Sequence, residues 1–256
     1  MSVITDLKVF ASERNINLIN QMKIAEEASI NITRKYNFTT EEIKENFDML
    51  LRETEQEAYR VYLSYEKEYG KSVLTEFYNF LIESKMISKL PDLPDVASEY
   101  FTVFDKFFLS LAQSRKTRAG KSFEKIHNSL FKILDYKFDE QRVINGKPDF
   151  LMPSYKYWQV NPLDCIVFTS KRTLRERWRQ IITEGTKGIG FFLATIDDKL
   201  TGAQLEEMHK NRIYIVCPES IIREKYRDKV NVISFSRFFK DYLDPAMDRW
   251  KRNGVI

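Results

Sequence analysis

An acid and a lysine stand beside apolar, strand-like segments in the second half of the chain. Asp149 directly follows a proline, and Lys171 ends an apolar run that begins at Cys165. Hydrolysis of a phosphodiester at neutral pH needs a divalent ion that activates a water, and a cation near the developing charge. Magnesium prefers carboxylates and water as ligands. The pair Asp149 and Lys171 is therefore what a magnesium-dependent nuclease requires on adjacent strands of a sheet.

A second acid is expected close to such a lysine. Its usual position is two residues before the lysine, and that residue here is Thr169. A helix predicted downstream, ending at Glu184, places this acid three residues after Ile181 on the face that can reach the sheet edge. Glu184 is thus the candidate second metal ligand. The alternative is that Glu184 only caps a surface turn before Gly185.

The start of the same predicted helix carries Arg175, Glu176 and Arg177. Arginine can donate two hydrogen bonds to guanine O6 and N7, and glutamate can accept from cytosine N4. A first turn bearing these three side chains suits a helix that enters the major groove and contacts G·C pairs. The competing interpretation is a capping box from Thr173 to Glu176 with two surface arginines.

A basic stretch from Gln113 to Ser122 includes Arg115, Arg118 and Lys121. We expect it to connect two helices within the range 101–134 and to contact the DNA backbone, since its small residues permit a close approach to phosphate. A solvated basic turn is the alternative.

Glu124 lies beside an apolar helical stripe that begins at Phe123. An acid on the flank of a core-facing stripe needs a partner or a metal. A salt bridge with Lys121 or Lys125 is the alternative to a role in catalysis.

Aromatic residues of the first half recur at helical spacing, which is typical of a core. An exception is the segment around Arg34, Tyr36 and Phe38, where cations and aromatics alternate before the predicted helix start at Thr39. This segment is either a DNA-facing loop or an ordinary one.

The order of the predicted elements indicates an α/β protein. Apolar residues at spacings of three and four predict helices to about residue 110, and strand-like runs then alternate with helices. Such alternation is typical of a mixed sheet covered by helices. We expect a helical N-terminal region, 1–100, and a catalytic core, 101–256, within one domain.

Composition sets further bounds. The net charge of +4 is mild, so the distribution of charge must identify any polyanionic partner. Cys165 and Cys217 lie in apolar runs and are expected to be free, buried thiols in a reducing cytoplasm. The first residues do not resemble a signal peptide, and no apolar run is long enough to span a membrane.

Together these motifs resemble one family, the type II restriction endonucleases of the EcoRII, PspGI and SsoII group, which are related to NgoMIV. The resemblance covers roughly residues 110–220. It rests on motifs whose spacing fits the family: Arg118 to Lys121 with Phe123-Glu124, Pro148-Asp149, Thr169-Ser170-Lys171, Arg175 to Trp178, and Glu184.

The resemblance implies a PD-(D/E)xK core, a mixed sheet flanked by helices. It implies that Asp149 and Glu184 bind Mg²⁺, that Lys171 is the catalytic lysine, and that Glu124 supports the site. It also implies that Arg175, Glu176 and Arg177 contact two G·C pairs per half-site, with Gln113 reaching them from the minor groove.

The family cuts palindromic double-stranded DNA with CC and GG halves, of the CCNGG or CCWGG type. It implies a homodimer, a paired DNA methyltransferase and a prokaryotic cytoplasm. Some members stack extruded bases on an aromatic residue, for which Tyr36 or Phe38, near Arg34, are the candidates. The alternative function is a catalytically silent or non-specific DNA-binding protein of the same fold.

Overall fold

The computed structural model describes residues 4–84, 93–144, 146–174 and 190–256, and the side chains of these residues except 93 and 116–121. The first half of the described chain is helical. Its helices are α1 (Leu7–Glu13), α2 (Gln21–Tyr36), α3 (Thr40–Glu45), α4 (Phe47–Glu83), α5 (Leu93–Glu99) and α6 (Phe101–Ile133).

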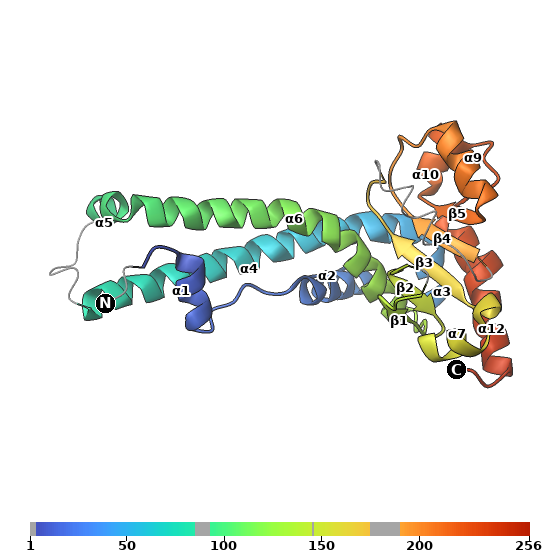
Figure 1. Cartoon of the computed structure of the whole chain (residues 1–256), viewed down its shortest axis with the longest axis horizontal. Helices are drawn as coiled ribbons and strands as arrows, with labels where there is room; N and C mark the ends of the chain where they lie inside the picture. The colour runs from blue at the N-terminus through green and yellow to red at the C-terminus, as the bar shows by residue number, and fades with distance from the viewer. Residues whose placement is uncertain (1–3, 85–92, 145, 175–189) are drawn as a thin grey trace.

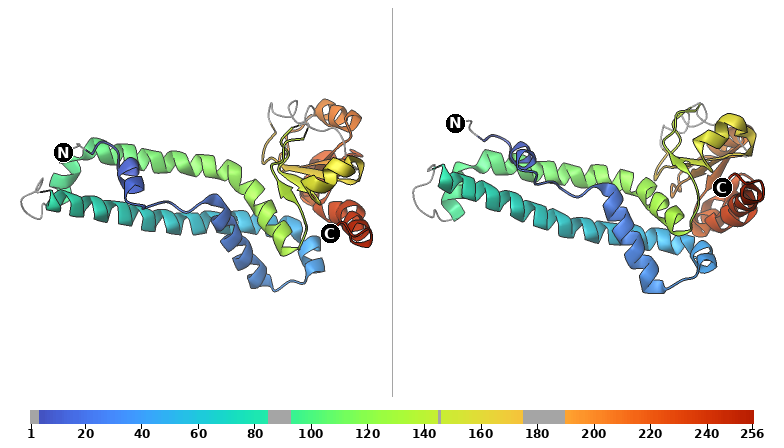
Figure 2. Two further views of the ribbon diagram at one scale, coloured as in Figure 1. Left: turned by 60° about the horizontal axis from the view of Figure 1, so that its bottom comes forward. Right: turned by 90° about the horizontal axis from the view of Figure 1, so that it is seen from below.

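Helices α4 and α6 lie side by side and form a long arm that extends away from the rest of the molecule (Figure 1; Figure 2). The far half of the arm has its own apolar core, in which Phe10 of α1 packs with Phe77 of α4 and Phe107 of α6. The near half of α4 joins the main core instead, through residues such as Phe47 and Leu50. The two helices therefore link the sheet to a separate hydrophobic cluster.

The second half contains a mixed sheet with the order β1-β2-β3-β4-β5-β6. The pairs β1/β2 and β2/β3 are antiparallel, and the strands from β3 to β6 are parallel. Its strands are β1 (Asp139–Glu140), β2 (Phe150–Met152), β3 (Ile166–Ser170), β4 (Gly190–Ala194), β5 (Ile213–Val216) and β6 (Val232–Ile233).

Short helical elements surround this sheet. They are α7 (Tyr155–Val160), η1 (Pro162–Asp164), α9 (Gly202–Lys210), α10 (Glu219–Ile221), η3 (Ile222–Tyr226), α11 (Phe235–Arg237), η4 (Phe238–Leu243) and α12 (Asp244–Arg252).

Alternate residues of the strands enter two different cores, as the period of a strand requires. Phe168 and Phe192 face the large core with residues of α2, α4, α6, η4 and α12. Val167 and Leu193 face the other core with Leu205 of α9. The sheet is thus covered on both faces, and the prediction of a mixed sheet flanked by helices with a helical N-terminal region is confirmed.

Several local predictions are confirmed. Thr39 caps α3 in a capping box with Glu42, so that two otherwise unpaired groups of the helix start are satisfied. The apolar run that begins at Cys165 forms β3, and the strand-like runs that follow it in the sequence form β4 and β5, parallel to β3.

One prediction about the chain between 101 and 134 is wrong. The stretch from Gln113 to Ser122 does not connect two helices, because α6 runs through it without a break. Arginine, lysine, glutamine and alanine favour helices, and the single interior glycine costs only about 1 kcal/mol. The apolar stripe resumes at the buried Phe123, and burial of this stripe outweighs the cost of Gly120.

Cys165 and Cys217 are buried free thiols, as predicted, and burial raises the pKa of each to about 12. Within the ranges that the structure describes, no helix combines the length and the apolar character needed to cross a membrane.

Candidate active site

The register between β2 and β3 places Asp149 against the end of β3. Phe150 pairs with Phe168, so Asp149, one residue before β2, lies across from Thr169. Lys171 follows β3 directly, and its amide donates to the Ala194 carbonyl of the neighbouring strand at 2.9 Å. The acid and the lysine predicted on adjacent strands thus meet at one end of the strand pair.

The Asp149 carboxylate is buried and receives hydrogen bonds from three successive residues. Oδ2 accepts from the Thr169 hydroxyl at 2.8 Å, from the Ser170 amide at 2.7 Å and from Lys171 Nζ at 3.0 Å. Lys171 Nζ also lies 3.2 Å from Oδ1. These donors fix the orientation of the carboxylate and offset the cost of burying its charge.

Thr169 has a structural role that the sequence pattern did not show. Its hydroxyl, at the position of the usual second acid, donates to Asp149 instead of offering another carboxylate. Residue 169 therefore supplies no second carboxylate at this end of the sheet.

Glu124 of α6 is partly buried and pairs with its neighbours. Lys125 Nζ lies 3.0 Å from Glu124 Oε1, and Gln141 Nε2 donates to the same oxygen at 3.2 Å. The backbone N–H of Gln141 in turn donates to the backbone carbonyl of Asp149 at 3.1 Å. Glu124 is thus connected through Gln141 to the backbone of Asp149, and its salt bridge is with Lys125, one of the two alternatives raised by the sequence.

His127 lies fully buried among aromatic rings beneath β3. Its Nδ1 is 2.8 Å from the Phe123 carbonyl, and its ring is 5.8 Å from that of Phe168. Burial lowers the pKa of His127 to about 4, against the smaller effects of the Phe123 hydrogen bond and of the Asp149 charge. The imidazole is therefore neutral at physiological pH.

Several predicted site residues lie outside the described residues. These are Arg175, Glu176, Arg177 and Glu184, and the side chains of Arg118 and Lys121. Among the residues that are described, no group of three or more His, Cys, Asp or Glu side chains could hold a metal ion.

Arg115 is engaged within the chain. Its guanidinium makes three hydrogen bonds to the buried carboxylate of Glu66 on α4, which raise the pKa of Arg115. Tyr62 also donates to Glu66. Arg115 is half exposed, and Gln113, two residues earlier on α6, is exposed.

Tyr36 and Phe38 contact each other rather than standing apart. Their rings stack with centroids 5.2 Å apart, and the Tyr36 hydroxyl donates to Glu53 at 2.6 Å. Tyr36 ends α2, and both rings pack against the large core. Arg34 lies in the last turn of the same helix, so the prediction of a loop at Arg34 and Tyr36 is wrong.

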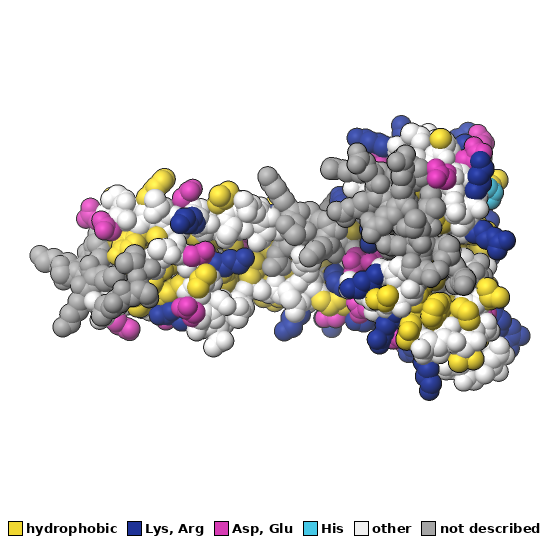
Figure 3. Space-filling view, viewed as in Figure 1, with side chains coloured by type: hydrophobic (Ala, Val, Ile, Leu, Met, Phe, Trp, Pro, Cys, Tyr) yellow, Lys and Arg dark blue, Asp and Glu magenta, His cyan; other side chains and the backbone are white. Residues whose placement is uncertain are grey.

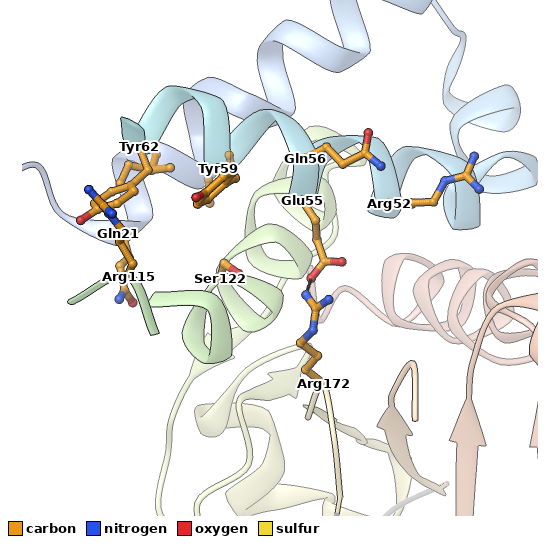
Figure 4. A pocket seen from close by; sticks show the side chains of 12 residues that line it. Gln21, Arg52, Glu55, Gln56, Tyr59, Tyr62, Arg115, Ser122 and Arg172 are labelled. Atoms are coloured by element: carbon orange, nitrogen blue, oxygen red, sulfur yellow. Dashed lines mark hydrogen bonds and ion pairs between the residues drawn. The ribbon is translucent and has the colours of Figure 1, made fainter. Parts of the chain in front are cut away.

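A cavity of about 540 Å³ lies beside the site and was not expected from the sequence. Figure 4 shows its wall of α4 side chains, with Arg115 and Ser122 from α6 opposite. Tyr59, which helical spacing assigned to the core, is 56% exposed and lines this cavity. The spacing of apolar residues predicts a helix, but it does not predict which residues at the edge of the apolar stripe stay exposed to solvent.

Arg172 joins this cavity to the candidate active site. It follows Lys171 in the sequence, and its guanidinium pairs with Glu55 of α4 across the cavity (Figure 4). No sequence signal links these two residues, which are 117 positions apart.

Charge on the viewed face of the molecule is mixed. Lysine and arginine side chains are interspersed with acidic ones on both the arm and the sheet region (Figure 3). This distribution agrees with the mild net charge of +4.

The fold of the chain is that of restriction endonucleases. The metal-depleted Ecl18kI structure in complex with uncleaved DNA superposes with a TM-score of 0.67 at 23% identity, covering 94% of this chain and 82% of that one. The PspGI–substrate DNA complex gives a TM-score of 0.59 at 22% identity, covering 86% of this chain and 92% of that one.

The chain belongs to the EcoRII C-terminal family, whose model matches residues 81–239. It is 28% identical to the type II restriction enzyme SsoII of Shigella sonnei over 195 residues, which is 70% of this chain and 63% of that enzyme. It is 32% identical to the type II restriction enzyme EcoRII of Escherichia coli over 145 residues, 53% of this chain and 36% of that enzyme. The family resemblance inferred from the motifs is thereby confirmed.

Proposed function

We propose that the chain is a type II restriction endonuclease that hydrolyses double-stranded DNA at a fixed site in the presence of Mg²⁺. The observation that carries this proposal is the Asp149 carboxylate, held by Thr169 and Ser170 against the ammonium of Lys171. The named relatives SsoII and EcoRII are type II restriction enzymes, which supports the assignment.

The donor set at Asp149 fits a hard divalent cation. Among the described residues, Oδ1 accepts a hydrogen bond from Lys171 alone, which leaves that oxygen free to bind a metal ion. Carboxylate oxygen is a preferred ligand of Mg²⁺. Asp149 would hold the ion together with Glu184, and the bound ion would polarise the phosphoryl oxygen and lower the pKa of a water.

The chain's own residues supply the remaining requirements. Lys171 places a positive charge where the attacked phosphoryl group gains negative charge. Thr169 and Ser170 hold the carboxylate in one orientation, so that it does not reorganise when the substrate arrives. Glu124, connected through Gln141 to the Asp149 backbone, supports this end of the sheet.

We assign recognition to Arg175, Glu176 and Arg177, which would contact G·C pairs of a site with CC and GG halves in the major groove. Gln113 would approach the same pairs from the minor groove. Arg115, Arg118 and Lys121 would contact the backbone, so binding should weaken steeply with salt. Glu176→Ala should relax the choice at a C·G pair, whereas Arg118→Ala should lower affinity for all sequences.

A palindromic site cut on both strands needs two active sites, so we propose a homodimer. The helical region 1–100 would support DNA contacts and the dimer, beside the core formed by 101–256. As a restriction enzyme the protein would act in a prokaryotic cytoplasm, where a methyltransferase must protect the host DNA.

Two places could receive a base extruded from the DNA. One is the pair Tyr36 and Phe38 near Arg34, whose rings already stack on each other. The other is the cavity beside Lys171, where Tyr59 is open to solvent. A 2-aminopurine base at the centre of the cleaved site should brighten on binding if it is extruded. A change in that signal in Tyr59→Ala, but not in Phe38→Ala, would assign the cavity.

The direct test is cleavage of unmethylated plasmid DNA with Mg²⁺, with the fragment ends mapped by sequencing beside an Asp149→Ala control. We expect discrete ends at CCNGG or CCWGG sites, absent in the control. Tight binding to DNA without cleavage under any divalent metal would favour the catalytically silent alternative, and cleavage at random positions would favour the non-specific one.

A further inference from the structure

The segment that carries Lys171 leaves β3 and has no regular secondary structure up to Leu174. One side of this segment forms hydrogen bonds with the residues that follow β4. The Thr195 hydroxyl donates to the Arg172 carbonyl at 3.3 Å, and the Leu174 amide donates to Asp197 Oδ2 at 2.8 Å. All of these contacts come from the sheet side.

The other side of the segment is held from the helical arm. Glu55 of α4 pairs with the Arg172 guanidinium, and its side chain is only 15% exposed, against 43% for Arg172. Burial raises the pKa of Glu55, and the charge and hydrogen bond of Arg172 oppose this rise. Glu55 is thus a desolvated carboxylate whose charge is compensated by the residue next to Lys171.

An ion pair of this kind is not expected to add much to the stability of the fold. Replacing a buried ion pair with apolar residues of similar volume is often neutral or stabilising, because two charges must be desolvated. A hydrogen-bonded ion pair restricts the relative position of its two side chains more than an apolar contact does. Arg172 lines both the cavity of about 540 Å³ and a second one of about 570 Å³ that Asp197 and Thr201 also line, so little packing holds its side chain otherwise.

We propose that Glu55 is a positioning residue of the active site, which acts through Arg172 to fix the segment Lys171–Leu174 and so the approach of Lys171 to Asp149. This inference rests on the proposed nuclease function. Glu55 itself does not touch the reacting groups, and its effect is on the rate of cleavage rather than on the affinity for DNA.

The test compares Glu55→Gln, Arg172→Gln and the double variant in the 256-residue chain. Single-turnover cleavage with Mg²⁺ is measured on a duplex that the wild type cuts, and DNA affinity is measured without divalent metal. Glu57→Gln is the matched control, since Glu57 is two residues further on α4 and pairs with Arg60 on the same helix. Thermal melting reports whether each variant is folded.

We expect Glu55→Gln to slow cleavage roughly 10-fold to 100-fold, since misplacing a reacting group by about 1 Å can cost 10²-fold. DNA affinity should stay within about threefold, and the double variant should be no slower than the slower single one, as coupled residues require. Glu55→Asp, which keeps the charge, should recover most of the rate even if Glu55→Gln melts early.

Other results would overturn the proposal. Additive losses in the double variant would mean that the two residues act separately. Tighter DNA binding by Glu55→Gln with an unchanged rate would identify Arg172 as a phosphate contact for which Glu55 competes. If the wild type cleaves no DNA, both the proposed nuclease function and the positioning role are wrong. If wild type and Glu55→Gln cleave at the same rate, only the positioning role is wrong.

Discussion

The candidate active site and the cavity beside it are both built around carboxylate–cation pairs, but the pairs arise differently. Asp149 and Lys171 meet because β2 and β3 are hydrogen-bonded neighbours in a fixed register. Glu55 and Arg172, like Glu66 and Arg115, join elements that no strand ladder aligns. Backbone geometry therefore fixes the first site, and side-chain ion pairs fix the second.

The two kinds of pair are expected to have different roles. The pair at the sheet holds the groups proposed for catalysis, and the pairs at the cavity align elements of the chain. Every hydrogen bond to the Asp149 carboxylate comes, among the described residues, from the three consecutive residues Thr169 to Lys171. The cavity draws its wall from α2, α4 and α6 together. Loss of the charge of Asp149 or Lys171 should therefore slow cleavage about 10³-fold, whereas changes at the cavity should shift stability and rate by smaller amounts.

The largest effect is expected for Lys171→Ala. Removing a charged donor from the developing negative charge should slow single-turnover cleavage about 10³-fold, while the affinity for DNA falls only a few-fold. Quench-flow or gel-based cleavage at saturating enzyme measures the rate. A rate within tenfold of the wild type would show that Lys171 is not the cation of the site.

A pH dependence of stability is expected beneath the sheet. His127 is neutral in the folded state with a pKa of about 4, whereas an unfolded histidine titrates near 6.5. The unfolded chain binds more protons between these values, so stability is present above pH 6.5 and falls by roughly 3 kcal/mol as the pH drops to 4.

The measurement is the free energy of urea unfolding across this pH range in wild type and His127→Phe. The variant lacks the titrating group, so its curve should fall less steeply with decreasing pH. Parallel curves for the two proteins would mean that His127 does not become charged on unfolding.

At the cavity, Glu66→Gln should lower the free energy of unfolding by about 2 kcal/mol. Loss of a fully buried pair costs more, but Arg115 is half exposed and water can solvate it. The control is Glu206→Gln, because Glu206 and Lys210 form an exposed pair worth about 0.5 kcal/mol or less. Equal effects of the two substitutions on the free energy of urea unfolding would mean that the pair of Glu66 and Arg115 stabilises the fold no more than an exposed ion pair does.

The smallest effect is expected for Thr169→Val. Loss of the hydroxyl that donates to Asp149 should slow cleavage about tenfold, the lower end of the range for a hydrogen bond to a charged group, because Ser170 and Lys171 still hold the carboxylate. Thr169→Ser, which keeps the hydroxyl, should cleave within about threefold of the wild type by the same reasoning. A Thr169→Val enzyme as fast as the serine variant would show that Ser170 and Lys171 orient the carboxylate without it.

The sequence predicted the sheet site better than the helical side of the molecule. Apolar runs of strand length, together with Pro148-Asp149 and Lys171, were enough to place the acid and the lysine on adjacent strands. The helix start at Thr39 was predicted from a local signal, a threonine followed by acidic residues in the first turn, and the structure adds a capping box with Glu42. In each of these cases the determining residues lie close together in the sequence or on neighbouring strands.

The failures involve contacts at long range. The basic stretch before Phe123 resembles a connection, yet α6 continues because burial on both sides of Gly120 stabilises the helix. The exposure of Tyr59 and the pair of Glu55 with Arg172 depend on how α4 packs against the sheet region. No pattern in one sequence specifies such packing.

The most direct test of the account is cleavage by Asp149→Asn, which keeps the shape of the side chain and removes its charge. Wild type and variant are compared on one duplex with Mg²⁺, with DNA affinity measured in parallel. We predict that the variant binds the duplex within about fivefold of the wild type and cleaves it at least about 10³-fold more slowly, because a neutral amide holds Mg²⁺ poorly. Cleavage by Asp149→Asn at the rate of the wild type would contradict the assignment of this strand pair as the active site.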